Sequence, residues 1–194
     1  EDEIMSLAEI LKKRRSYYNI NRELPVSEEK VLDIIKEVAD ATPDAFNMQS
    51  ARLVVVLGEK QDKMWDKIYD TFDGRVAREK IDAFKAGYGT ILFFIEEDTV
   101  RSLQEQFASY AHHFPTWANQ SNGMLQSNLW VGLREVGIGA SLQHYNPVID
   151  SAVTELLDLP ESWKLIAQMP FGGILSEPDT KERAPIETRV IIKK

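Results

Sequence analysis

The chain has 194 residues, no cysteine and a net charge of −8 at pH 7. The lack of cysteine excludes disulfides, thiolate metal sites and cysteine nucleophiles, and the negative charge disfavours nucleic acid or anionic membranes as partners, because both require a basic face. A chain of this length can bury roughly 70% of its unfolded surface, so we expect one domain over residues 1–194.

The sequence contains no obvious membrane or export segment. No run approaches the roughly 20 apolar residues that span a bilayer, and the first ten residues are acidic where a secretory signal is basic. A chain without cysteine also suits a reducing compartment. These features predict a cytoplasmic protein with no membrane partner.

A first helix is predicted from a capping box that begins at Ser6 and continues to about Arg14. It ends in the cationic run 12–16, which is Lys-Lys-Arg-Arg-Ser. These cations could simply complement the helix dipole. They could also form a phosphate clamp, because arginine presents a planar fork of donors and the Ser16 hydroxyl adds another.

A second predicted helix begins after Ser27 and ends before Thr42-Pro43, and a strand follows over 53–57. The loop between them contains Asn47 and Gln49, whose amides donate and accept at once. A ligand edge with alternating donors and acceptors requires such groups. Ordinary loops contain them too, so the ligand interpretation stays open at this point.

The middle of the chain predicts surface helices over 61–71 and 76–85, with their charges in solvent. The continuous apolar run 91–95 is typical of a strand covered on both faces, and we place it at the sheet centre. A helix from residue 98 or 99 to 107 then leads into an aromatic segment that ends at Trp117.

The motifs for several common chemistries are missing. His112 and His113 should point in different directions and have no carboxylate at ligand spacing, so no metal site is predicted. There is no P-loop and no G-x-S-x-G elbow, and Gly137-Ile138-Gly139 precedes a strand rather than following one. The sequence therefore disfavours kinases, hydrolases and Rossmann dehydrogenases.

The segment 121–147 looks like the organising unit of the chain. A buried helix is predicted over 121–136, with Gly137 in the left-handed conformation that ends a helix. Gly139 would allow a second turn, and residues 140–145 alternate as a short strand before Asn146-Pro147. Such a unit can hold a planar ligand at the strand end, where glycines let the main chain approach and leave N–H groups free.

The last part of the chain predicts a helix over 151–157 and a strand over 164–169 that stops at Pro170. A polar loop over 178–185 carries Lys181 and Arg183, and residues 188–192 form a β-rich end. Such a tail either frays or pairs with a sheet edge, for example on another subunit.

Four short motifs now stand in a particular order: R-R-S at 14–16, P-x-x-x-N-x-Q at 43–49, a glycine-rich helix end before 143–147, and K-x-R at 181–183. This order resembles the FMN-dependent nitroreductase family, and 46–50 with 139–147 resembles its fatty-acid-repression-type subgroup. The resemblance covers nearly the whole chain. It implies an α+β nitroreductase-like fold with a central, mostly antiparallel sheet flanked by helices, in an intertwined homodimer.

The resemblance also implies cofactor-binding residues in three groups. The FMN phosphate and ribityl chain would be held by Arg14, Arg15, Ser16, Lys181 and Arg183. A loop from the opposite protomer would contribute Asp44, Ala45, Phe46 and Asn47, with Gln49 beside them. Gln143, His144 and Tyr145 would lie along the isoalloxazine, with a main-chain N–H donating to flavin N5.

The implied activity is ping-pong hydride transfer from NADH or NADPH through the flavin to a nitroaromatic, quinone or similar planar acceptor. The cofactor performs the chemistry, so no catalytic side chain is required. His144 could pack beside the flavin or act as a proton donor. The alternatives are specialised flavin chemistry, such as dehalogenation, and a non-catalytic flavin- or lipid-responsive regulatory protein on the same fold.

Two departures from the family pattern affect the predicted site. Tyr18 stands where many relatives carry a basic residue, and Asp44 stands where a small hydroxyl residue is common. The Asp44 carboxylate would either lie at the flavin edge, where it disfavours a reduced anion, or point to solvent. The cation that faces the flavin pyrimidine edge could be Arg78, Lys80 or Lys85.

Overall fold

A computed structural model describes residues 4–194 of the chain. The first three residues, which contributed to the acidic start noted above, lie outside this range. The elements in chain order are α1 (Leu7–Lys13), β1 (Ile20–Asn21), α2 (Glu28–Ala41), the 3-10 turn η1 (Ala45–Asn47), β2 (Ala51–Leu57), α3 (Glu59–Phe72), α4 (Arg78–Lys85), β3 (Gly89–Glu96), α5 (Glu97–Gln106), η2 (Ala108–His113), α6 (Phe114–Glu135), β4 (Ile138–Ala140), α7 (Asp150–Leu157), β5 (Trp163–Ile174) and η3 (Ile186–Thr188).

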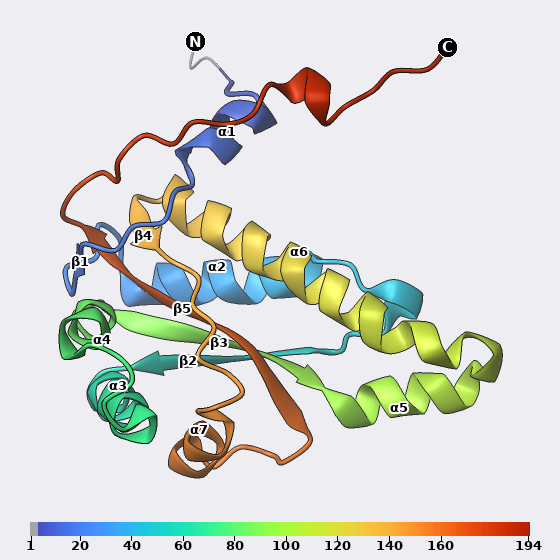
Figure 1. Ribbon diagram of the computed structural model, residues 1–194, viewed down its shortest axis with the longest axis horizontal. Helices are drawn as coiled ribbons and strands as arrows, with labels where there is room; N and C mark the ends of the chain where they lie inside the picture. The colour runs from blue at the N-terminus through green and yellow to red at the C-terminus, as the bar shows by residue number, and fades with distance from the viewer. Residues whose placement is uncertain (1–3) are drawn as a thin grey trace.

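The strands form one antiparallel sheet in the order β1-β5-β3-β2, with β4 also paired to β5 (Figure 1). The central position of β3 confirms the prediction for 91–95, because every residue of 91–95 is buried. The predicted α+β class with an antiparallel sheet is also confirmed. Sequence analysis missed β1, which has only two residues and carries no pattern of its own.

Helices cover both faces of the sheet (Figure 1). Side chains from α2 and α6 pack against one face, and side chains from α3 and α7 pack with those of α4 against the other. The alternation of β3 explains the two cores, because Phe93 belongs to the first cluster and Leu92 to the second. None of the helices within residues 4–194 is both long and apolar enough to cross a bilayer.

The long helix α6 begins seven residues earlier than predicted, at Phe114 rather than 121. Pro115 occupies its first turn, where the missing N–H has no intrahelical acceptor in any case. The predicted left-handed Gly137 is confirmed by its φ of 84°. The capping box at Ser6 is confirmed as well.

The predicted strand over 140–145 is wrong. The strand is β4, Ile138–Ala140, and Gly139 lies inside it rather than at a second turn. A Cβ atom on Gly139 would stand 2.8 Å from the Tyr17 side chain, so the glycine permits close packing. Residues 141–146 form a loop, with one isolated bridge between Gln143 and Gln168.

Strand β5 continues through Pro170, where sequence analysis expected it to stop. The Pro170 carbonyl faces the 138–143 segment and accepts from the Ser141 N–H at 3.2 Å. In an antiparallel strand the N–H and C=O of one residue point to the same side. The missing N–H of Pro170 therefore falls on that side, and the ladder with β3 loses no hydrogen bond.

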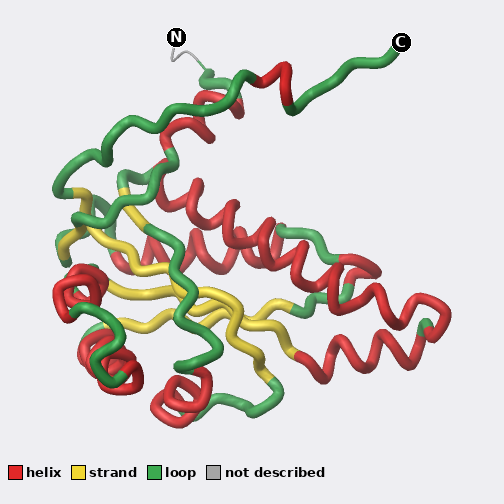
Figure 2. Tube along the Cα trace, in the orientation of Figure 1, coloured by secondary structure: helices red, strands yellow, loops and turns green. Residues whose placement is uncertain are grey.

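The C-terminal segment runs as a loop with one helical turn, η3, and reaches away from the sheet (Figure 2). The β-rich end predicted at 188–192 is not a strand in the isolated chain. Val190, Ile191 and Ile192 are 58%, 73% and 78% exposed. A strand needs an edge to pair with, and in the single chain this segment has none.

Candidate functional site

One end of α6 carries the predicted phosphate-binding segment. Ser16 forms a parallel bridge with Ala140, and the Tyr17 N–H donates to the Ala140 carbonyl at 3.0 Å. The Trp130 indole N–H contacts two carbonyls, those of Arg15 at 3.2 Å and Ala140 at 3.0 Å. These contacts fix residues 15–17 against both α6 and β4.

Three guanidinium groups meet at this end. The Arg14 guanidinium lies 4.3 Å from the centre of the Trp130 ring. Burial lowers the pKa of Arg14 from its ordinary value, and the charges of Arg15 and Arg183 lower it further. Within residues 4–194, these three arginines and Lys181 form no salt bridge with a carboxylate. Like charges gathered without an acidic partner are a candidate anion site.

The C-terminal segment is tied to this end by polar contacts across the chain. The Arg15 guanidinium donates to the Asp179 carbonyl, and the buried Tyr17 hydroxyl contacts the Glu177 carboxylate at 2.9 Å. The Arg134 Nε donates to the Tyr17 hydroxyl at 3.0 Å. Arg183 follows shortly after these contacts. Lys181 is exposed on the same segment, and no contact ties its ammonium to the cluster.

Loop 143–146 leaves the same region and is held against β5. The Gln143 N–H donates to the Gln168 carbonyl at 2.7 Å, and the Tyr145 N–H donates to the Gln168 Oε1 at 2.7 Å. His144 is exposed between them. The Tyr145 ring packs into the core at 5.3 Å from Phe72, and burial raises the pKa of its hydroxyl. The Tyr145 hydroxyl is thus buried and is not presented to a ligand.

Loop 44–50 lies at the other end of α6, where the Ser121 hydroxyl donates to the Pro43 carbonyl at 2.7 Å. The Asp44 carboxylate accepts from the Ala45 N–H at 2.8 Å, the Ser50 N–H at 3.0 Å and the Ser50 hydroxyl at 2.6 Å. The alternative in which Asp44 points to solvent is therefore wrong, whereas a place beside the flavin edge stays a prediction. Its carboxylate closes the loop and is neither unpaired nor directed to solvent.

This loop adopts an unusual backbone. Phe46, Asn47 and Gln49 have φ values of 56°, 50° and 51°, in the left-handed region that non-glycine residues seldom enter. Such backbone concentrates at ligand sites, where surrounding contacts must hold it. The side chains of all three residues are exposed, and the Arg52 guanidinium donates to the Gln49 carbonyl at 2.7 Å.

Phe46 belongs to an aromatic cluster, which consists of Phe46, Phe107, Tyr110, Phe114 and Trp117. The Phe46 and Trp117 rings are stacked, with centroids 5.8 Å apart and an interplanar angle of 16°. Phe46 and Tyr110 remain 47% and 48% exposed. The aromatic segment was predicted, but its contact with loop 44–50 was not. His112 and His113 were expected to point in different directions, whereas their ring centroids are only 3.9 Å apart.

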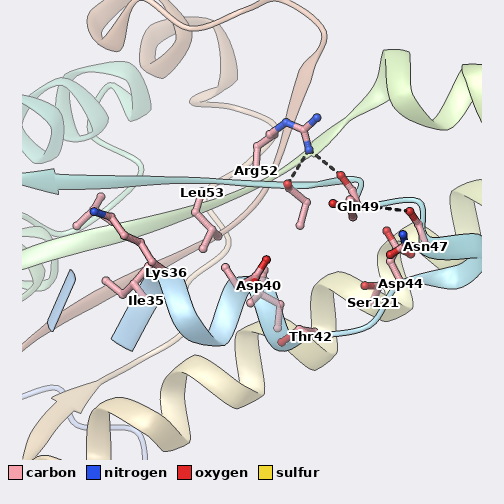
Figure 3. A pocket seen from close by; sticks show the side chains of 14 residues that line it. Ile35, Lys36, Asp40, Thr42, Asp44, Asn47, Gln49, Arg52, Leu53 and Ser121 are labelled. Atoms are coloured by element: carbon pink, nitrogen blue, oxygen red, sulfur yellow. Dashed lines mark hydrogen bonds between the residues drawn. The ribbon is translucent and has the colours of Figure 1, made fainter. Parts of the chain in front are cut away.

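A cavity of about 740 Å³ opens beside this loop, between α2, β2 and α6 (Figure 3). Asn47 and Gln49 line it, and Arg52 and Lys36 place cations on its walls. No local pattern in the sequence indicated that Arg52 would line this cavity. The apolar part of the lining comes from Leu53, Leu125, Ile35, Ala39, Ala51 and Val55, and the polar side chains of Asp40, Thr42, Asp44 and Ser121 complete it.

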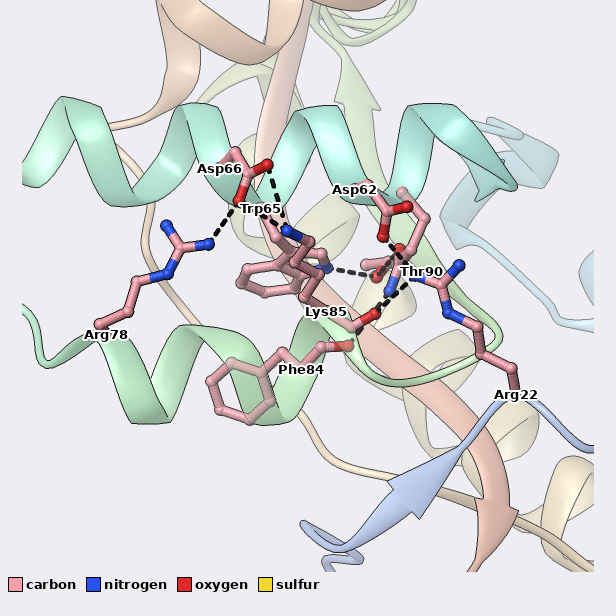
Figure 4. A network of polar contacts seen from close by, with 9 residues as sticks. Arg22, Asp62, Trp65, Asp66, Arg78, Phe84, Lys85 and Thr90 are labelled. Carbon is pink, nitrogen blue, oxygen red and sulfur yellow. Dashed lines mark hydrogen bonds and ion pairs between the residues drawn. The ribbon is translucent and has the colours of Figure 1, made fainter.

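The cations considered for the flavin pyrimidine edge are not in this cavity. Arg78 and Lys85 on α4 pair with Asp66 on α3 at 2.6 and 3.0 Å, between the two helices (Figure 4). The hydrogen bond from Arg78 lowers the pKa of Asp66. Lys80 is exposed on α4. Arg78 and Lys85 thus lie on the predicted charged surface, where their side chains are 37% and 28% exposed and engage in ion pairs.

The predicted site residues therefore lie in two groups within one chain. We call the region of Arg14–Ser16, Arg183 and loop 143–146 the cation half, and loop 44–50 with the aromatic cluster the loop half. Trp130 marks the first and Ser121 the second, nine residues apart on α6, or about 14 Å. No cluster of His, Asp and Glu within residues 4–194 could hold a metal ion.

Comparison with known proteins gives consistent matches. The sequence profile of the Nitroreductase family matches residues 11–173. Putative nitroreductase HBN1 and nitroreductase FRM2, both from Saccharomyces cerevisiae, are 32% and 33% identical to this chain over 171 residues, which is 87% of this chain and 88% of each relative.

Solved structures agree in fold. Nitroreductase CinD from Lactococcus lactis in complex with chloramphenicol is 44% identical, with a TM-score of 0.93, over 97% of this chain and 100% of that chain. Its complex with 4-nitrophenol is similar at a TM-score of 0.92, with the same coverage. A putative nitroreductase in complex with FMN from Exiguobacterium sibiricum is 14% identical, with a TM-score of 0.76 over 99% of both chains, and shares the fold.

Proposed function

The chain belongs to the nitroreductase family, and on this premise we propose that it is an FMN-dependent oxidoreductase that uses NADH or NADPH to reduce nitroaromatics, quinones or similar planar acceptors. The observation that carries the proposal is the cation half. Arginines from opposite ends of the sequence lie together there and form no salt bridge within residues 4–194, next to a loop in which His144 is exposed.

The cation half fits the FMN phosphate in charge and donor type. Arg14, Arg15 and Arg183 would bind the phosphate oxygens together with the Ser16 hydroxyl, and Lys181 would join them from its exposed segment. A dianion would stabilise the Arg14 charge against the burial and the mutual repulsion that lower its pKa. Each charged hydrogen bond contributes about 1.5 to 3 kcal/mol, so two or three are enough to retain the cofactor.

When bound, FMN supplies the hydride-transfer chemistry, and the chain supplies placement and electrostatics. Loop 143–146 would lie along the isoalloxazine. The exposed His144 imidazole could donate a proton to the acceptor, but the chemistry does not require it. The Asn47 and Gln49 amides would contact the flavin pyrimidine edge, and Arg52 is the cation closest to them along the chain.

We further propose that a homodimer completes the site. The cation half and the loop half lie at different ends of α6, and a second copy would bring its loop half to the cation half of the first. Gly123 and Ser127 leave an exposed strip of α6 where another helix could approach. The exposed apolar residues 190–192 would be covered by exchange of C-terminal segments.

The aromatic cluster supports a planar acceptor. Phe46 is held on the stacked Trp117 ring, and its outer face is half-exposed. Aromatic rings gain about 0.5 to 1.5 kcal/mol from such pairs beyond the area they bury. The CinD structures contain 4-nitrophenol or chloramphenicol, and acceptors of this aromatic kind match the geometry of the cluster.

Reconstitution tests the proposal. Purified protein should bind one FMN per chain and consume NADH or NADPH when a nitroaromatic or a quinone is added. A protein that takes up no FMN would contradict the proposal. A protein that binds FMN but turns over negligibly with a broad acceptor panel would support the regulatory alternative. A cytoplasmic location remains a prediction.

A further inference from the structure

Gln168 is a polar residue in the apolar core. It lies on β5 opposite Leu92 and has no exposed surface. Its side chain enters the layer beneath α3, α4 and α7, where Leu92 and the Tyr145 ring also pack. An amide in such a place destabilises the fold unless its donor and acceptor are both satisfied.

The hydrogen bonds of Gln168 go to loop 143–146. Its main-chain N–H and C=O both pair with Gln143, at 2.9 and 2.7 Å. Its side-chain oxygen accepts from the Tyr145 N–H at 2.7 Å, and its side-chain nitrogen donates to the Asn146 Oδ1 at 2.9 Å. One buried residue thereby fixes three of the four loop residues.

His144 is the loop residue that Gln168 does not hold. The N–H groups of Gln143 and Tyr145 are used in the contacts above, whereas the His144 N–H makes no hydrogen bond within residues 4–194. The His144 side chain is also exposed. The clamp therefore leaves one main-chain donor available between two that are occupied.

We propose that Gln168 is a positioning residue that holds loop 143–146 so that the His144 main-chain N–H can donate to flavin N5. This inference rests on the proposed function, because it requires bound FMN. It adds the identity of the donor and of the buried residue that positions it. Neither was indicated by the sequence, where Gln168 sits in an ordinary strand pattern.

Gln61 provides a matched comparison. It is also fully buried, and its side chain makes two hydrogen bonds, to the Phe84 carbonyl at 3.1 Å and from the Thr90 hydroxyl at 2.7 Å. These partners lie in the core rather than in loop 143–146 (Figure 4). A role limited to core stability would make Gln61 and Gln168 equivalent. A positioning role predicts that substitution of Gln168, but not of Gln61, affects the bound flavin.

The experiment compares Gln168→Met with Gln61→Met, because methionine matches glutamine in length and removes both side-chain hydrogen bonds. The readout is the midpoint potential of bound FMN, with FMN affinity and melting temperature measured alongside. Oxidised N5 offers a lone pair to the N–H, whereas reduced N5 carries a hydrogen there, so the contact favours oxidised flavin and its loss raises the potential.

We expect both substitutions to lower the melting temperature and only Gln168→Met to raise the midpoint potential. A tenfold change in the relative affinity for reduced and oxidised FMN corresponds to about 30 mV for a two-electron couple. An unchanged potential in FMN-loaded Gln168→Met would overturn the inference. So would an equal rise in Gln61→Met.

A second variant covers the case in which Gln168→Met does not fold. Asn146→Ala removes only the acceptor of the Gln168 side-chain nitrogen and leaves the contact with the Tyr145 N–H in place, without adding a charge. We expect a smaller rise in potential with the same sign, and no rise would contradict the inference. If the wild-type chain binds no FMN at all, the proposed function fails first, and this outcome is visible before any variant is made.

Discussion

The two ends of α6 are built in different ways. The cation half is assembled from distant parts of the sequence, because Trp130 binds the Arg15 carbonyl and Arg15 binds the Asp179 carbonyl. The loop half is largely local, and the Asp44 carboxylate closes it through Ala45 and Ser50. The cation half therefore requires the whole fold, whereas a few neighbouring residues are enough to shape the loop half.

The cation half should respond most strongly to a change of charge. Arg14→Ala removes a donor that approaches phosphate, and we expect FMN affinity to fall by about 10- to 150-fold, because a charged hydrogen bond contributes about 1.5 to 3 kcal/mol. Fluorescence titration with FMN measures the loss. The control is Arg75→Ala, which removes an exposed arginine outside both halves of the site that donates to the Phe72 carbonyl. Equal affinities in the two variants would refute the assignment.

The loop half should instead respond through stability. Asp44→Ala removes the acceptor of two loop N–H groups, those of Ala45 and Ser50. We therefore expect the free energy of unfolding to fall by about 1 to 3 kcal/mol. Urea denaturation measures this change, with exposed Asp40→Ala as the control. If Asp44→Ala is as stable as the control, the carboxylate does not hold the left-handed residues of the loop.

The aromatic cluster should affect binding of the electron acceptor. Trp117→Leu removes the ring on which Phe46 stacks, and we expect the KM for a nitroaromatic to rise by about 2- to 13-fold, since such a pair contributes about 0.5 to 1.5 kcal/mol. The same variant assayed with ferricyanide, which has no ring, is the control. A parallel rise in both KM values would show that the cluster acts on the fold and not on the acceptor.

The smallest effect is expected at Tyr145. Its ring is in the core and its buried hydroxyl has no hydrogen-bond partner within residues 4–194. Tyr145→Phe should therefore leave FMN affinity within about twofold of wild type and keep or slightly raise the melting temperature, because an unsatisfied polar group is removed. A large loss of FMN affinity would show that the hydroxyl, rather than the main chain, serves the site.

Local signals in the sequence were sufficient for much of the fold. The capping box at Ser6, the left-handed Gly137 and the apolar run at 91–95 were all predicted, because each depends on neighbouring residues. Pro170 was misjudged because the side to which its missing N–H points depends on β4, which lies 30 residues away in the sequence. When that partner is not known, the general rule that proline ends a strand predicts that the strand stops at Pro170.

The site shows the same division. The amide pair Asn47 and Gln49 could be found from a short motif. Trp130 and Gln168 could not, because an indole N–H or a buried amide acquires its role only when the fold selects its partners. The strand at 140–145 was predicted from alternation alone, whereas the chain instead forms a loop that Gln168 clamps. Side-chain partners, rather than periodicity, decide the structure there.

We propose above that the cation half of one copy and the loop half of another bind the same FMN. The direct test is the FMN content of a mixed dimer in which one chain carries Arg14→Ala with Arg183→Ala and the other carries Asn47→Ala with Gln49→Ala, under conditions in which neither parent dimer retains FMN. The claim predicts one FMN per mixed dimer, because one site combines both intact halves. A mixed dimer without FMN would show that each site lies within a single chain.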